Sequence, residues 1–482
     1  MWQRESALGQ RRNKRARALR ASPHLEHLEQ RYVLTNSLVV VPSPVVPRAF
    51  LAGTAAIAAN DIWAVGSITG GRYQTLAEHF DGNSWQVVPT PSPGNVSQLL
   101  GVVAVAGNDV WAVGTAGGAL IEHWDGSSWT IIDGPTSAHA LYEVTATSSN
   151  DVWAVGNDGH RNALVEHWDG SSWSVVSSSA FTGVEQLYSV SADAGNDVWA
   201  TGQASTRGGA PFDGQAVLHF DGTGWTIINP QTQVGFGSVT ALSPTDLWAV
   251  GSVIEAYDPE TGEVSSARAA IAHWDGARWQ EVPSPDPRPG GQGLSGLGGV
   301  AAISSTDIWA VGVPGSGNTL TEHWDGTSWS IIPSPSPTPF GNGVAAVTAL
   351  SDGTVAAVGY QADPNTRQFT PLILQNPESA PPGSGPAVPA ASLFVHASAD
   401  LRLSLAGPST VSNVAMRDTP LLQDQRNARS VNPVFASGKP DSALSFARDR
   451  SLAQQGPEDH LDRMDAIDRL FTEWFVVPAL AG

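Results

Sequence analysis

The sequence predicts an all-β fold, a seven-bladed β-propeller of four-stranded antiparallel blades, from three observations. A phrase of the form Asn60-Asp-Ile-Trp-Ala-Val-Gly66 occurs six times, and a seventh copy, Gly353-Thr-Val-Ala-Ala-Val-Gly359, has Ala356 in place of the tryptophan. Successive copies lie 48, 42, 46, 49, 61 and 47 residues apart, a period typical of propeller blades. Glycine (50), proline (34) and tryptophan (18) are abundant and charged residues are sparse (15%), which favours many short strands and turns.

Each unit contains four short apolar runs of strand length. In the second unit they are Gly101–Val105, Asp109–Gly114, Leu120–Trp124 and Trp129–Ile132. The runs are rich in β-branched and aromatic residues and are separated by turn residues. The recurrent Asp-Gly step suits a tight hairpin, because glycine accepts the positive φ that such a turn requires. We therefore expect four antiparallel strands in each unit.

The last unit has only three such runs, near Val344–Leu350, Thr354–Tyr360 and Leu372–Gln375. A run that reads like a fourth strand, Ser37-Leu-Val-Val-Val-Pro-Ser-Pro44, stands ahead of the first unit. We expect it to be the outermost strand of blade seven. This closes the ring, removes an open sheet edge and assigns residues 37–377 to one propeller, which we expect to be monomeric.

Three residue types recur at fixed places. The second-strand tryptophans predict packing between blades rather than sugar stacking: Trp63, Trp111, Trp153, Trp199, Trp248 and Trp309. The third-strand histidines predict packing residues hydrogen-bonded to the neighbouring blade, because equivalent positions in adjacent blades lie too far apart to share a metal ion: His79, His123, His167, His219, His273 and His323. Aspartates directly after a turn predict carboxylates that accept local backbone N–H groups: Asp61, Asp109, Asp151, Asp197, Asp246 and Asp307.

The run His123-Trp-Asp-Gly-Ser-Ser-Trp129 and the strand that ends in glycine resemble the repeats of kelch and galactose-oxidase-type propellers over about residues 37–377. The repeats differ in having one glycine, not two, after the second strand. The Asp-Gly-Ser-Ser-Trp turn is also similar to that of tectonin-type lectins and to the longer Asp-box turn of sialidases. These resemblances imply one fold and several functions. The copper site of galactose oxidase implies a cysteine-modified tyrosine, and this chain has no cysteine.

The unequal loop lengths indicate which face binds. The third-strand aromatic always precedes the fourth-strand tryptophan by five residues, whereas the second-strand tryptophan precedes the third-strand aromatic by 13 to 26. The connections to the next blade also vary, and both variable connections are expected on one face, the loop face. Its longest loop is expected at Ser252–Arg268. Candidate binding residues are Arg72, Tyr73, His160, Arg161, Arg207, Tyr257, Asp258, Arg268, Arg288, Phe340, Tyr360 and Arg367.

The net charge of −20 and the lack of a basic stripe in the repeats argue against nucleic acid as a partner. No metal site, cofactor site or catalytic constellation is predicted; in particular, the arginines are too scattered for a sialidase-like site. We therefore predict a non-catalytic scaffold that presents the loop face to a protein or a glycan. The alternative is a carbohydrate-active enzyme, a hydrolase or a lyase, with its site at the central funnel.

The flanks carry separate predictions. Residues 1–36 contain a basic run, Arg11–Arg20, followed by Leu25-Glu-His-Leu-Glu-Gln-Arg31, which resembles the leader of many secreted or surface-associated bacterial proteins. It implies an extracellular or envelope location, with the cytoplasm left open. No uninterrupted apolar run is long enough to span a membrane. Residues 378–457 predict a flexible tail, residues 458–476 an amphipathic helix that docks on the propeller or on a partner, and residues 477–482 a short tail.

Overall fold

The structure is a computed structural model that describes residues 37–376 apart from 136–139, 206–213, 259–263, 289–292, 315–316, 340, 364–365 and 367. The described residues belong to one of two compact units of the chain, residues 1–386 with 459–482, and the other unit, residues 387–458, lies outside them. The predicted leader, tail and helix (1–36, 378–457 and 458–476) also lie outside the described residues.

The described residues form seven four-stranded antiparallel sheets, the blades. Blades 1 to 3 comprise β2 (Ala49–Ala58), β3 (Asp61–Ile68), β4 (Gln74–Phe80), β5 (Trp85–Val88); β6 (Gln98–Ala106), β7 (Asp109–Thr115), β8 (Ala119–Trp124), β9 (Trp129–Ile131); and β10 (Ala140–Ser148), β11 (Asp151–Asn157), β12 (Ala163–Trp168), β13 (Trp173–Val175). Blades 4 to 6 comprise β14 (Val184–Ala194), β15 (Asp197–Ala204), β16 (Gln215–Phe220), β17 (Trp225–Ile228); β18 (Gly235–Ser243), β19 (Asp246–Tyr257), β20 (Val264–Trp274), β21 (Trp279–Val282); and β22 (Gly296–Ser304), β23 (Asp307–Val313), β24 (Leu320–Trp324), β25 (Trp329–Ile331). Blade 7 comprises β26 (Asn342–Ala349), β27 (Val355–Ala362), β28 (Phe369–Gln375) and β1 (Val39–Val40), and a short 3₁₀ helix, η1 (Ser179–Phe181), precedes β14.

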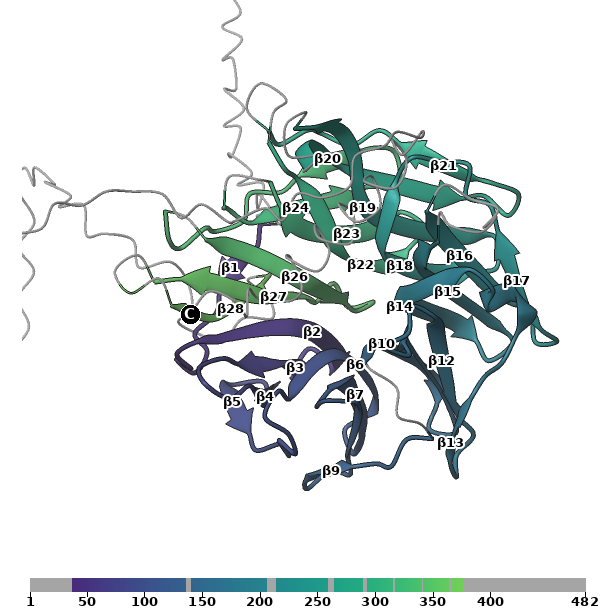
Figure 1. Ribbon diagram of the computed structural model, residues 1–482. Coiled ribbons are helices and arrows are strands. Elements are labelled where there is room, and N and C mark those ends of the chain that lie inside the picture. Colours follow the sequence, from purple (N-terminus) through teal and green to yellow (C-terminus); the bar gives the residue numbers. More distant parts are fainter. Residues whose placement is uncertain are drawn as a thin grey trace, which may run out of the picture. The chain divides into compact units, whose positions relative to one another are not determined.

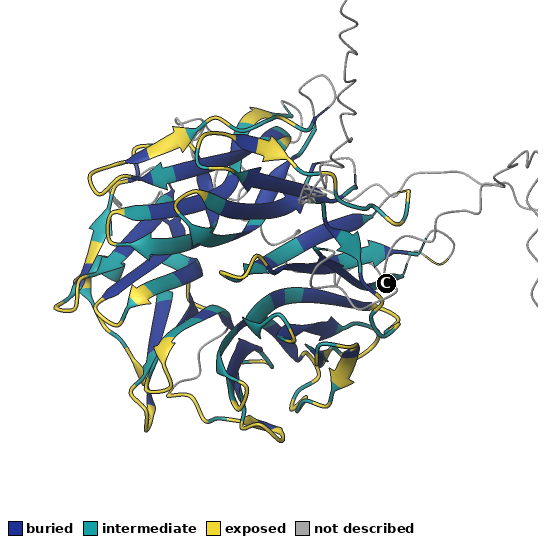
Figure 2. Cartoon of the chain, turned by 180° about the vertical axis from the view of Figure 1, so that it is seen from behind, coloured by how far each residue is buried: buried dark blue, intermediate teal, exposed yellow. Residues whose placement is uncertain are grey.

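The first strand of every blade faces the centre, as Figure 1 shows, and each inner strand contacts the next around the ring, including β26 against β2. Figure 2 shows that buried residues follow the inner and middle strands while the turns are exposed. The predicted closed seven-bladed propeller is thus confirmed.

The glycine that ends each repeated phrase is required by the inner strand beside it. Every inner strand carries a β-bulge near its start, such as the register shift between Leu99 and Gly101 opposite β7. The bulge pushes the inner-strand backbone toward its partner, so that a Cβ on Gly114 would lie 1.9 Å from the carbonyl oxygen of Gln98. Only glycine fits at this place.

Strand β1 completes blade 7 as predicted. Val39 and Val40 pair with Gln375 and Leu374 of β28, and the Val41 N–H donates to the carbonyl of Ile373 at 3.0 Å. The strand is shorter than the predicted run 37–44. Leu38 is buried and packs in one cluster with Trp309 of blade 6, so the N-terminal segment closes the ring with a side chain as well as with backbone bonds.

The second-strand tryptophans lie between blades, as predicted. Trp63 packs on Trp124 and Trp129 of blade 2, with ring centroids 5.0 and 5.3 Å away. The same contact to the third-strand aromatic of the next blade recurs at 5.1 to 5.5 Å for Trp111, Trp153, Trp199 and Trp248. At the junction of blades 7 and 1, Ala356 takes the tryptophan's place and packs near Phe80 and Trp85.

The repeated aspartates and histidines have a different role from the predicted one. Each aspartate accepts a hydrogen bond from the histidine Nε2 of its own blade, at 2.5 to 2.8 Å, and not from local backbone N–H groups. In five blades the tryptophan Nε1 donates to the same carboxylate at 2.9 to 3.2 Å. The histidine therefore bonds within its blade, not to the neighbouring one, because antiparallel pairing sets it directly opposite the tryptophan.

The aspartate that does hold a turn is the one in the Asp-Gly step. Asp125 Oδ1 accepts the N–H groups of Ser127 and Ser128 at 2.8 and 2.9 Å, and Gly126 has φ +93°. The Ser127 hydroxyl donates to the same oxygen at 2.7 Å. This bond and the two N–H bonds lower the pKa of Asp125 to about 2. The predicted tight turn with positive φ at glycine is confirmed.

Four third-strand glutamates are fully buried: Glu78, Glu122, Glu166 and Glu322. Glu122 Oε2 accepts a hydrogen bond of 2.7 Å from the Thr90 hydroxyl, in the connection that leaves blade 1. Burial raises the pKa of Glu78 and of Glu322 to about 8 and that of Glu122 to about 7. These carboxyls are therefore largely protonated at or just below neutral pH.

The closure predicts a stability difference between two truncations of the chain. Removing residues 1–41 deletes β1 and Leu38, exposes the edge of β28, and should lower the free energy of unfolding by about 3 kcal/mol. Removing residues 1–36 is the matched control and should leave the thermal midpoint close to that of the full chain. Equal midpoints for the two truncations, measured by circular dichroism, would show that β1 does not close the ring.

The buried glutamates predict that stability falls as the pH rises. Their folded pKa values lie at about 7 to 8, above the ordinary 4.5 that we assign to the unfolded chain. Between these values the unfolded state binds fewer protons than the folded state, so the free energy of unfolding decreases through this window and levels off above about pH 8.

Scanning calorimetry from pH 5 to 9 measures this slope. Glu78→Gln combined with Glu322→Gln should flatten it and raise the midpoint at pH 8, because the amide cannot ionise. A midpoint that rises from pH 5 to 8, or a slope unchanged in the double variant, would contradict the assignment.

Candidate functional site

The two kinds of variable connection meet on one face, the predicted loop face. Tyr73, in the loop after β3, exchanges backbone hydrogen bonds with Asn95 and Ser97 of the connection between blades 1 and 2, at 3.0 and 3.1 Å. Ala267 makes the same pair of bonds with Gly293 and Ser295 beside blade 5. These bonds join loops from one blade to the connection that enters the next.

The longest predicted loop, Ser252–Arg268, is largely a β-hairpin rather than a loop. Strand β19 runs to Tyr257 and β20 starts at Val264, with Val253 opposite Arg268 and Ile254 opposite Ala267. The ladder of paired residues therefore continues past the point where shorter blades turn, with irregular pairing near Ala256.

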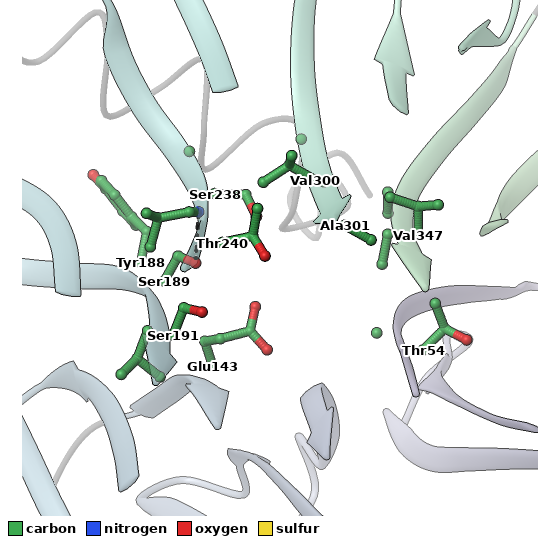
Figure 3. Close-up of a pocket in the computed structure, with 18 of the residues that line it drawn as sticks. Thr54, Glu143, Tyr188, Ser189, Ser191, Ser238, Thr240, Val300, Ala301 and Val347 are labelled. Atoms are coloured by element: carbon green, nitrogen blue, oxygen red, sulfur yellow. Dashed lines mark hydrogen bonds between the residues drawn. The ribbon is translucent and has the colours of Figure 1, made fainter. Parts of the chain in front are cut away.

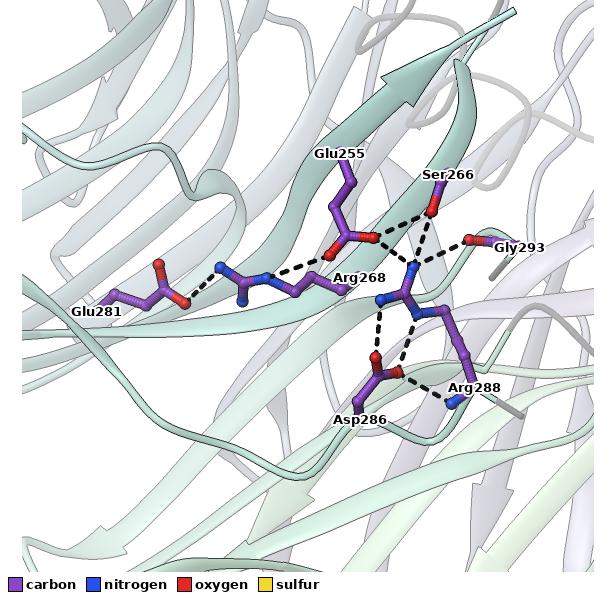
Figure 4. A network of polar contacts seen from close by, with 7 residues as sticks. All are labelled: Glu255, Ser266, Arg268, Glu281, Asp286, Arg288 and Gly293. Carbon is purple, nitrogen blue, oxygen red and sulfur yellow. Dashed lines mark hydrogen bonds and ion pairs between the residues drawn. The ribbon is translucent and has the colours of Figure 1, made fainter. Parts of the chain in front are cut away.

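Two predicted binding arginines brace this hairpin from within (Figure 4). Arg288 is buried and pairs with both oxygens of Asp286 and with Glu255 Oε2, at 2.7 to 2.9 Å. The carboxylates of Asp286 and Glu255 raise the pKa of Arg288 well above its ordinary value. Arg268 contacts Glu281 at 2.6 Å and Glu255 at 3.8 Å. Arg288 thus ties the hairpin to the connection between blades 5 and 6 and does not face solvent.

The other predicted residues are spread around the loop face. Arg72, His160 and Arg161 are exposed, and Tyr73, Tyr257, Asp258 and Tyr360 are half-buried. Tyr360 packs edge-on against Phe369, with ring centroids 5.0 Å apart. Arg207, Phe340 and Arg367 lie outside the described residues.

The inner strands enclose a central channel of about 330 Å³ (Figure 3). All of its lining residues lie on the seven first strands. Blades 6, 7 and 1 contribute mostly small and aliphatic residues such as Gly299, Ala346 and Gly53, with the hydroxyls of Thr54 and Thr348, whereas blades 3 to 5 contribute phenols, an amide, a carboxyl and hydroxyls. The channel wall is therefore more polar on the side of blades 3 to 5.

A polar cluster stands where this side meets the loop face. We call it the mouth cluster, and its members come from the start of the inner strands and the end of the second strands in blades 3 and 4: Tyr142, Asn157, Gln186, Tyr188 and Gln203. Asn157 Nδ2 donates to the Tyr142 hydroxyl at 2.6 Å. Gln186 Nε2 donates to the Tyr188 hydroxyl at 2.9 Å and to Gln203 Oε1 at 2.8 Å. These bonds fix the orientation of both phenol rings, whose centroids lie 6.2 Å apart.

Arg161 borders the mouth cluster. Its guanidinium lies 3.7 Å from the carboxylate of Glu185, the residue before Gln186. Arg161 has φ +63°, a left-handed conformation that is uncommon for a residue with a side chain. Such backbone strain is concentrated at functional sites. The sequence identified Arg161 as a candidate and missed the cluster beside it.

Glu143 lies deeper in the channel and points into it (Figure 3). Burial raises its pKa to about 8, and a weak bond from the Val144 N–H opposes that rise. The register places Glu143 directly after the bulge, where the other blades have Gly53, Gly101, Ser189, Ser238, Gly299 and Ala346. A small residue is therefore sufficient for the fold at this place, and blade 3 carries a carboxyl instead.

The sequence contained a signal for this site that loop lengths do not give. Aligning the units on their first strands would have shown glutamate in one unit where the others have glycine, serine or alanine. The variable loops are conspicuous in the sequence because their lengths differ, whereas Glu143 and Tyr142 differ from the equivalent residues of other units only in residue type.

In the part of the chain that the structure describes, no three acidic or histidine side chains converge to hold a metal ion. In the same part, no helix is long and apolar enough to cross a membrane.

Comparison with known proteins adds similarities of fold. No protein-family model matches the chain, and no curated protein matches it either. Among solved structures, YCF48 bound to a D1 peptide is 15% identical with a TM-score of 0.46, covering 70% of this chain and 94% of that chain. YCF48 from Cyanidioschyzon merolae has the same identity and score, covering 70% of this chain and 98% of its own. A PL25 ulvan lyase bound to -[GlcA(1-4)Rha3S]- is 11% identical with a TM-score of 0.44, covering 70% of this chain and 94% of its own. At these identities the similarity concerns the propeller fold alone.

Arg288 is expected to stabilise the protein rather than to bind a partner. Arg288→Met keeps the aliphatic stem but removes the cation between Glu255 and Asp286, which leaves only Arg268 beside Glu255. It should lower the free energy of unfolding by about 2 kcal/mol, less than for a fully buried pair because both carboxylates are partly exposed. Hydrogen exchange should accelerate in β19 and β20. Arg278→Met, at an exposed pair with Asp275, is the control and should change stability by less than about 1 kcal/mol. If Arg288→Met is as stable as the wild type, the conclusion that Arg288 stabilises the hairpin is wrong.

Proposed function

We propose that this propeller is a non-catalytic binding module that holds a protein or glycan partner on its loop face, centred on the mouth cluster. The observation that carries the proposal is the cluster itself: two phenols and three amides, oriented by mutual hydrogen bonds at the opening of an enclosed channel. Rigid phenols with placed amide groups are typical of specific recognition, because little side-chain entropy is lost on binding.

Two further features support this face. The loops that surround the cluster vary in length between blades while the opposite turns do not, and variable connections of a repeat protein are where partners are usually held. Arg161 offers an exposed guanidinium beside the cluster, and arginine is common at binding hot spots. The basic leader motif supports an extracellular or envelope location, and the kelch-like character of the repeats remains part of the proposal.

The alternative, a carbohydrate-active enzyme with a site in the central funnel, has one observation in its favour. Glu143 is a carboxyl with raised pKa, the property required of a proton donor. Hydrolysis of glycosides generally uses a second carboxyl about 5 to 10 Å away. Among the residues that line the channel in the described part of the chain, Glu143 is the single carboxyl. Binding therefore ranks above hydrolysis.

A binding screen with the full chain tests the proposal. Immobilised protein is offered a glycan array and, separately, extracellular protein extracts from cells that produce it. Any partner captured by the wild-type chain should bind Arg161→Glu and Gln186→Ala at least about tenfold more weakly, because both changes alter the mouth of the channel.

The matched control is Arg278→Glu, an exposed arginine in the invariant turn between β20 and β21, which should bind as the wild type does. A partner whose affinity is unaffected by Arg161→Glu and Gln186→Ala but reduced by Arg278→Glu would assign binding to the opposite face. Release of reducing sugar or of unsaturated products from any glycan, abolished by Glu143→Gln, would favour the enzyme.

A further inference from the structure

Glu143 has an ionisable side chain at a position where the fold does not require one. Six of the seven equivalent positions are glycine, serine or alanine, so a small residue satisfies the bulge. Holding a carboxyl out of water destabilises the folded protein unless something pairs with it. A half-buried carboxyl that the fold does not need, on the wall of the channel, is therefore a functional candidate.

The surroundings of Glu143 provide acceptors rather than a partner cation. Figure 3 shows the Ser191 and Thr240 hydroxyls, from β14 and β18, directed toward the same space as the Glu143 carboxyl. The Ser191 oxygen accepts the N–H of Ala241 at 3.0 Å, which fixes its position on the wall. The other titratable groups that line the described channel are the phenols Tyr142 and Tyr188, and the lining contains no lysine, arginine or histidine.

The chemistry of this wall selects among ligands. An anion would meet the carboxyl and the field of a chain with net charge −20. A divalent metal ion would find one carboxyl among the described residues that line the channel, and no group of three acidic or histidine side chains that could hold it. A neutral polyol would be satisfied by hydroxyls and would leave the carboxyl unexplained. A primary ammonium group has three N–H donors and one positive charge, which match one carboxylate and two hydroxyl oxygens.

We propose that Glu143, Ser191 and Thr240 bind a primary ammonium group that enters the channel from the loop face on an unbranched chain, the side chain of a lysine on a protein partner. The inference rests on the proposed binding function and names the group recognised. The small residues of blades 6, 7 and 1 leave room for the methylene stem along the opposite wall. Because the carboxyl is mostly protonated at neutral pH in the free protein, ammonium binding must release its proton to solvent.

Calorimetric titration of the full chain with n-butylammonium chloride, a model of the lysine side chain, tests the proposal. At pH 7, titrations in phosphate and in HEPES, two buffers without a primary amine, should differ in enthalpy by the amount that corresponds to release of close to one proton per site. Nα-acetyl-lysine methylamide should behave in the same way. The neutral analogue 1-butanol should show no proton release, and glucosamine distinguishes an amino sugar from an unbranched chain.

Glu143→Gln and Glu143→Ala should each weaken n-butylammonium binding at least about tenfold and abolish proton release, since neither side chain ionises. Alanine is tolerated at this place, as Ala346 of blade 7 shows, so loss of fold is not expected. Glu122→Gln changes a buried carboxyl outside the channel and is the matched control. Equal affinity of wild type and Glu143→Gln, binding without proton release, or no binding of n-butylammonium at 50 mM would overturn the inference.

The two proposals fail separately. If a captured partner still depends on Arg161 and Gln186 while Glu143→Gln leaves its affinity unchanged, the binding module stands and the ammonium site falls. If n-butylammonium binds as expected while no partner depends on the mouth cluster, the loop-face proposal falls. A stronger response to glucosamine than to the lysine derivative would overturn the choice of a protein lysine.

Discussion

The insertion of one blade's second-strand tryptophan between the aromatic side chains of the next blade is the interaction on which the ring depends. Four strands of short length cannot bury both faces of their own sheet, so each blade requires its neighbour. The tryptophan meets this need by lying against the third and fourth strands of the following blade. The Asp–His pair of its own blade holds it there, since the histidine ring lies against the indole with ring centroids 4.1 to 4.6 Å apart. The polar pair thus orients the apolar wedge.

Ring closure also determines what stands at the centre. Seven inner strands converge, each with a bulge, and the approach of backbones leaves space for small side chains at most of the positions that follow the bulge. The channel is a consequence of this geometry and is not itself evidence of function. The channel is distinguished by its uneven lining: blades 3 and 4 depart from the small-residue pattern with Tyr142, Glu143 and Tyr188. Closure of the ring does not require these larger polar residues.

The scaffold was predictable from the sequence because each of its determinants repeats. The period fixed seven units, the Asp-Gly step indicated the tight turn, and the lone run at Ser37–Pro44 indicated the closing strand. The partners of the repeated aspartates were not predictable, because sequence order shows Asp61 next to a turn and does not show that pairing sets it beside His79. The prediction that Arg288 is exposed was wrong for a related reason. Its pair with Glu255 joins residues 33 positions apart, and the nearby Asp286 does not distinguish a buried arginine from an exposed one. The mouth cluster requires knowledge of which strand ends meet.

The seam between the chain's two ends has a mechanical consequence. Six blades are continuous stretches of chain, but the outer edge of blade 7 is held by a short segment: the pairs of Val39 and Val40, the bond from the Val41 N–H, and Leu38 packed beside Trp309. A load applied to the N-terminal side of the propeller is carried by this short contact before it reaches any complete blade. Under tension the ring would therefore open at one defined place, where β1 separates from β28. The separation would remove Leu38 from Trp309 and expose this indole to water, so that its fluorescence would change first.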